Sequence, residues 1–131
     1  SATPTSVDQS MRNVRRCMRL EVAKYLYDAQ HAAATLAEFV AGRDFAEYQR
    51  NAMLRAAVER QFEIIGEALA QLGKREPSLL EKIDHYRQII AFRNILIHGY
   101  AEVDDALVWD IVQSRLKPLQ LQIDVLLTAD K

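Results

Sequence analysis

The stretch FRNILIHGY, residues 92–100, decides how the rest of the chain is interpreted. It places Arg93, Asn94, His98 and Tyr100 among apolar and small residues. Polar groups that leave water need partners, because an unpaired buried polar group is costly. Gly99, just after the last apolar residues, is a typical helix stop. The stretch therefore predicts the end of an apolar helix that carries either a satisfied polar cap or a functional site.

The composition on either side favours helices. The chain has 131 residues, of which 50% are hydrophobic and 27% charged, and it contains only four Gly and three Pro. That length fits one domain, and that composition favours long helices over strands. We expect an all-α protein, an antiparallel four- to five-helix bundle over residues 18–131. Residues 1–17 are expected to be a disordered leader or a vector-derived extension that runs into the first helix.

Two helices are expected in the first half of the chain. Apolar residues recur every three or four positions over residues 11–41, as one face of a helix requires, and Gly42 should end that helix. Asp44 followed by Glu47 is a capping-box spacing that predicts the next helix start. That segment should reach Leu72 and stop at Gly73, with a break at Asn51.

Two more helices are expected in the second half. Ser78 and Glu81 repeat the capping-box spacing and predict a helix that runs to residue 97 or 98. Its apolar residues lie on most sides, which indicates burial, including burial against a second subunit. The last helix should be capped by Asp104 or Asp105. Pro118 should bend or split it, because proline removes a backbone donor.

Charge, cysteine content and the length of the apolar runs narrow the classes of protein to which the chain can belong. The net charge of −1 gives no overall attraction to nucleic acid, so RNA binding would need a local patch. The lone Cys17 cannot form an internal disulfide, which fits a reducing cytoplasm. No apolar run approaches the ~20 residues of a membrane span. One basic cluster occurs near the N-terminus, formed by Arg12, Arg15, Arg16 and Arg19. We interpret it as the solvent-exposed start of a helix.

Other candidate site residues have simpler explanations. His31 and His85 lack zinc-ligand spacing, so we interpret them as structural or surface residues and predict no metal site. The carboxylates at 59, 63 and 67 recur every four residues, and without a Glu-x-x-His pattern they predict a solvated or partner-facing stripe. Gly66 lies in the middle of a helix, where glycine usually marks close helix packing.

Arg93 and His98 lie five residues apart, about 140° around a regular helix, so they do not share a face. Asn94 shares the face of His98 and is placed to hydrogen-bond the imidazole and fix its tautomer. Because Gly99 follows at once, His98 falls in the last turn, from which its ring can swing toward Arg93.

This pair has the chemistry of metal-independent RNA cleavage. An imidazole can remove a proton from the 2′-hydroxyl or donate one to the leaving oxygen, because its unperturbed pKa of ~6.5 is close to working pH. A guanidinium binds two phosphate oxygens at once. Two copies of Arg93 and His98 across a dimer axis would supply acid, base and two clamps. The alternative is structural, since histidine near a helix C-terminus is also a common cap.

The sequence resembles the HepT-type HEPN proteins. RNILIHGY is similar to their Arg-x4-His-x-Tyr signature, and AVERQFEIIGEAL and VDDALVWDIV resemble their upstream and closing helices. The resemblance covers about residues 18–127. It implies a helical bundle that dimerises through the motif helix and acts as a metal-independent RNase without a cofactor. Arg93 and His98 would be catalytic, with Asn94 as their polar companion.

The resemblance also implies a biological setting. HepT proteins usually act as cytoplasmic toxins, and their partner is a minimal nucleotidyltransferase antitoxin, often called MntA. That antitoxin can transfer AMP to the tyrosine of the motif, here Tyr100. The alternative is a non-catalytic nucleotide- or RNA-binding partner subunit of such a nucleotidyltransferase.

Overall fold

A computed structural model describes residues 6–99 and 103–129, with backbone only at residues 6–8 and 13–18. The described residues form six α-helices and no strand, which confirms the expected all-α bundle. In chain order they are α1 (Ser6–Val40), α2 (Phe45–Arg50), α3 (Ala52–Arg75), α4 (Pro77–Leu80), α5 (Tyr86–His98) and α6 (Asp105–Ala129).

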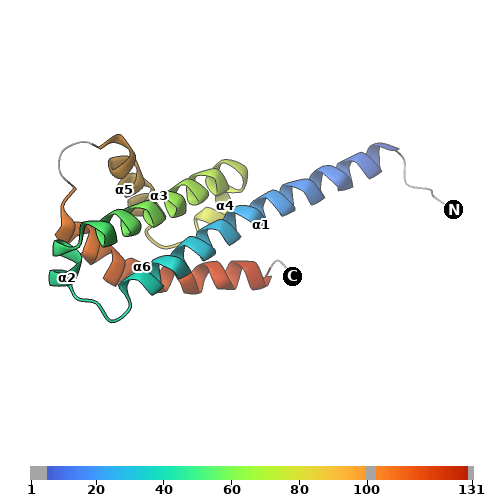
Figure 1. Ribbon diagram of the computed structural model, residues 1–131. Helices are drawn as coiled ribbons and strands as arrows, with labels where there is room; N and C mark the ends of the chain where they lie inside the picture. The colour runs from blue at the N-terminus through green and yellow to red at the C-terminus, as the bar shows by residue number, and fades with distance from the viewer. Residues whose placement is uncertain (1–5, 100–102, 130–131) are drawn as a thin grey trace.

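The long helix α1 is the axis of the bundle. α3 and α6 both pack along it and run in the opposite direction, while α5 packs on α3 (Figure 1). The N-terminal part of α1 extends past the other helices, and Val22 is its first described buried residue. The assignment of residues 1–17 to a separate leader stays a prediction.

The apolar pattern found in the sequence forms the core. On α1 the apolar face expected over residues 11–41 is buried at its centre, where four residues are at most 2% exposed: Leu26, Ala29, Ala33 and Leu36. On α6 an apolar stripe is buried as well, formed by Val108, Ile111, Val112, Leu116, Leu119, Ile123 and Leu126. Tyr48 of α2 closes one end of this core, with its ring 5.3 Å from that of Trp109. Burial of this continuous stripe is the main force that holds the helices together.

Three predicted helix boundaries are confirmed. Asp44 caps α2, because its carboxylate accepts from the backbone N–H of Glu47 at 2.8 Å. Asn51 breaks the second segment: it ends α2 and caps α3, accepting from the N–H of Leu54 at 3.0 Å. Gly99 ends α5 in the left-handed region, with φ of 60°.

The predicted stop at Gly73 is wrong, because α3 continues to Arg75. Gly73 has no positive φ. A Cβ there would lie 2.5 Å from Cδ2 of Leu80, so this glycine makes room for a buried leucine. Glu76 is the C-cap of the helix, and Pro77, which follows it, cannot continue the helix.

The predicted helix start at Ser78 is also wrong. α4 begins at Pro77, and Ser78 instead donates its hydroxyl to Glu76 Oε1 at 2.9 Å. The predicted single helix is two, because the chain turns after Leu80 and passes through His85, whose φ is 60°. Asp84 in this turn is tied to Gln122 of α6 by two hydrogen bonds of 2.8 Å.

Pro118 does not split α6, which continues through it to Ala129. The carbonyl that loses its N–H partner belongs to Ser114. Both residues are exposed, so water can satisfy that carbonyl. Asp104, as predicted, lies at the start of this helix, and its carboxylate accepts from the N–H of Ala106 at 3.0 Å.

Gly66 marks close packing between α3 and α5, as the sequence predicted. A Cβ at this position would lie 2.3 Å from Cβ and 2.6 Å from Cγ of Arg93. Neither atom is the free end of a flexible side chain, so no residue with a Cβ fits at position 66 unless the helices separate.

We therefore expect Gly66→Ala to lower the free energy of unfolding. Separating the helices should cost about 1–3 kcal/mol, which outweighs the gain of about 1 kcal/mol from replacing a mid-helix glycine. Urea unfolding would measure it. Gly73→Ala is the matched control, because Leu80 meets the new methyl with the end of its side chain and can rotate. A stabilised Gly66→Ala protein would contradict the close approach.

Candidate functional site

Helix α5 is held on α3 by its inner face. Ile89 and Phe92 are buried, and the ring of Phe92 meets that of Phe62 edge-on with centroids 5.4 Å apart. On the other side Arg115 of α6 donates from Nε to Gln88 Oε1 at 2.9 Å. These contacts fix the orientation of the helix that carries the motif.

Arg93 follows Phe92 and lies against α3. Its side chain is 17% exposed, and Nη2 lies 3.3 Å from Oε2 of Glu67. Nε is buried and has no hydrogen-bond partner among the described residues. The guanidinium therefore lies at the junction of α3 and α5, beside Glu67.

His98 and Asn94 lie on the outer face of α5. Both are exposed, and His98 is the last residue of the helix, just before Gly99. Ile95 and Ile97 beside them are 43% and 50% exposed. Asn94 and His98 thus share one face of α5, as predicted. Arg93 lies on another face and points toward α3. Tyr100 lies outside the described residues.

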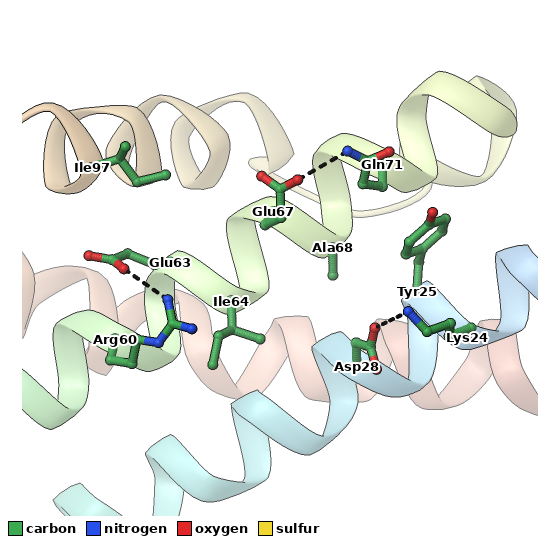
Figure 2. Close-up of a pocket in the computed structure, with 10 residues that line it drawn as sticks. All are labelled: Lys24, Tyr25, Asp28, Arg60, Glu63, Ile64, Glu67, Ala68, Gln71 and Ile97. Carbon is green, nitrogen blue, oxygen red and sulfur yellow. Dashed lines mark hydrogen bonds and ion pairs between the residues drawn. The ribbon is translucent and has the colours of Figure 1, made fainter.

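A groove of about 480 Å³ opens beside the Arg93–Glu67 contact, between α1, α3 and the end of α5. Figure 2 shows Glu63 and Glu67 of α3 and Ile97 of α5 on its walls. Its charged groups are paired: Lys24 with Asp28 at 3.5 Å and Arg60 with Glu63 at 3.3 Å. With three carboxylates and two cations, this groove favours no phosphate.

The carboxylate stripe of α3 faces arginines. Glu67 pairs with Arg93 and Glu63 with Arg60. Burial raises the pKa of Glu59, the negative charges of Asp105 and Glu63 raise it further, and Arg55 partly opposes them. Among residues 6–99 and 103–129, as far as their side chains are described, no cluster of His, Cys, Asp or Glu is suited to hold a metal ion. His31 and His85 are both exposed.

The sequence did not reveal that Glu67 is the ion-pair partner of the motif arginine. Glu67 was interpreted only as part of the stripe, although its carboxylate contacts the motif arginine. One feature of the sequence could have indicated this contact: Glu67 directly follows Gly66, the glycine that allows α5 to pack closely against α3.

The fold and the motif together define a class: an all-α, HEPN-like bundle in which α5 carries Arg93 in its second half and His98 at its C-terminal end. The chain belongs to the ribonuclease HepT-like family, whose family model matches residues 29–126.

Curated relatives agree with this membership. A Methanocaldococcus jannaschii protein named "Putative RNase MJ1380" is 33% identical over 107 residues, which are 80% of this chain and 95% of the relative. "Putative RNase TTE0752" of Caldanaerobacter subterraneus subsp. tengcongensis is 29% identical over 107 residues, 82% of this chain and 95% of the relative. No solved structure gave a significant match. Family and relatives together support an RNase function.

None of the helices in the described part of the chain is both long enough and apolar enough to cross a membrane.

Proposed function

We propose that this protein is a metal-independent endoribonuclease toxin of a HEPN–nucleotidyltransferase toxin–antitoxin pair. Arg93 and His98 are its catalytic residues, and Asn94 orients the imidazole. The observation that carries the proposal is the end of α5, where an exposed histidine follows an arginine whose guanidinium is held in place by Glu67. The family membership supports RNA as the substrate.

The reaction is a transesterification that needs only proton transfers. A base removes the 2′-hydroxyl proton, and the 2′-oxygen forms a bond to phosphorus. The bond from phosphorus to the 5′-oxygen breaks, and an acid protonates that oxygen. The products are a 2′,3′-cyclic phosphate and a 5′-hydroxyl. His98 handles protons, and Arg93 stabilises the extra negative charge on phosphorus.

The proposal includes a homodimer through α5. One protomer supplies a single imidazole, whereas the reaction uses an acid and a base. The exposed Ile95 lies on the same side of α5 as Asn94 and His98 and would be buried by a second copy of the helix. The carboxylates that line the groove repel phosphate, so we infer that the scissile phosphate does not bind inside the groove.

Cleavage should persist in EDTA and should depend on His98. We expect His98→Ala to lower the rate of RNA cleavage by about 10²–10⁴-fold, the usual contribution of a general acid or base. Denaturing gels of labelled RNA, with the 2′,3′-cyclic phosphate identified by mass, would measure this. His85→Ala is the matched control, because His85 is exposed and lies at the other end of α5.

Equal cleavage by wild type and His98→Ala would remove His98 from the mechanism. If neither protein cuts RNA and wild type does not arrest growth when expressed alone, the chain is instead the non-catalytic nucleotide- or RNA-binding partner of a nucleotidyltransferase.

The dimer should depend on the outer face of α5. Ile95→Glu places a charge in the proposed interface, so we expect it to shift the mass measured by light scattering from two chains to one. Cleavage should fall with it. Leu121→Glu is the matched control, since Leu121 is 58% exposed on α6. A wild-type protein that is monomeric at assay concentration while it cleaves RNA would contradict the shared site.

AMP transfer to Tyr100 completes the proposal. The phenolic oxygen attacks the α-phosphorus of ATP and pyrophosphate leaves, which places an AMP diester two residues beyond His98. Its negative charge would repel RNA and compete for Arg93.

Incubation with ATP and the cognate nucleotidyltransferase should add the mass of one or more AMP groups to wild type and none to Tyr100→Phe. Intact-mass spectrometry measures this, and Tyr86→Phe, a tyrosine at the start of α5, is the control. The same added mass on Tyr100→Phe would place the modification elsewhere.

A further inference from the structure

We propose that Gly66 and Glu67 of α3 form a positioning element for Arg93, fixing its guanidinium before RNA binds. The inference rests on the proposed function, because it assigns these residues a purpose only if Arg93 clamps the scissile phosphate. Neither residue would touch RNA; both would act through the arginine.

Gly66 fixes the base of the arginine side chain. The space where a Cβ of residue 66 would lie is taken by Cβ and Cγ of Arg93. The first part of the side chain is therefore packed against the backbone of α3, which restricts its first torsion angles. An arginine on a solvated helix surface would sample many rotamers there.

Glu67 fixes the tip. Its Oε2 lies 3.3 Å from Nη2 of Arg93, and its Oε1 accepts a hydrogen bond from Nε2 of Gln71 at 3.0 Å. Gln71, Glu67 and Arg93 thus form a chain in which each member orients the next. Glu67 is 54% exposed, so solvent screens the pair and it adds little to the stability of the fold. The pair instead affects the orientation of the Arg93 guanidinium.

This arrangement selects which nitrogen can serve the reaction. Nε is buried and Nη2 lies beside Glu67, so the proposal assigns Nη1 to the contact with a phosphate oxygen. A clamp that is already oriented loses little freedom when the transition state forms. Loss of Glu67 should therefore slow the chemical step more than it weakens RNA binding.

The test compares carboxylates one turn apart on the same helix. Glu67→Gln removes the charge that orients Arg93, whereas Glu63→Gln is the matched control, because Glu63 lines the same groove but pairs with Arg60. Cleavage would be followed in single-turnover assays with enzyme in excess and RNA length fixed. The dependence on enzyme concentration separates the maximal rate from the half-saturating concentration.

We expect Glu67→Gln to lower the maximal rate about tenfold, since misplacing a catalytic group by about 1 Å costs up to ~10²-fold. The half-saturating concentration and the urea midpoint should change little. Gln71→Ala should give a smaller loss of maximal rate, and Glu63→Gln should behave as wild type. A merely structural role for Glu67 would move the urea midpoint instead.

Arg93→Ala separates this inference from the proposed function. If Arg93→Ala cleaves as wild type does, Arg93 is no clamp and the proposed function fails. If Arg93→Ala is impaired while Glu67→Gln matches Glu63→Gln, only the positioning role fails. Faster cleavage by Glu67→Gln would make Glu67 a competitor of phosphate and would also overturn the inference.

Discussion

The candidate site depends on one close contact, the approach of α5 to α3 at Gly66. The rings of Phe62 and Phe92 pack between the two helices. Because residue 66 is glycine, the Cβ and Cγ of Arg93 can pack directly against the α3 backbone. Since α5 makes its main contacts with α3, its place in the bundle is set largely by this junction. The position of the motif arginine is therefore a consequence of helix packing, and a change in that packing would move it.

The same junction places a carboxylate beside the motif arginine. The guanidinium is only 17% exposed, and Glu67 approaches it from the solvent side, where the pair adds little stability but orients the arginine. Glu67 is the residue next to Gly66, so one turn of α3 provides both the space and the carboxylate. The neighbouring charges of the groove are paired among themselves, which leaves Glu67 as the carboxylate directed at Arg93 among the described residues.

Apolar spacing predicted the fold, because burial of a periodic stripe depends on local sequence. The buried face of α1 and the break at Asn51 lie where the sequence predicted them. The errors fall at helix boundaries, where a nearby residue overrides the expected stop or cap. Gly73 has the sequence of a helix stop, but Leu80 packs over it, and Pro77 precedes the expected cap. In the site, spacing identified the motif helix, whereas the contact between Glu67 and Arg93 joins two helices and has no local signature.

The five-residue spacing of Arg93 and His98 gains a physical reason from this arrangement. Residues four apart would share a face, so both would be packed on α3 or both would point outward. Residues five apart lie about 140° apart around the helix. One can then be held rigidly by its own bundle while the other is exposed to a second copy or to RNA. In the proposed dimer, each protomer would contribute one arginine fixed on α3 and one exposed imidazole. The motif thus divides the two requirements of the proposed reaction, fixed charge and mobile proton, between the two faces of a single helix.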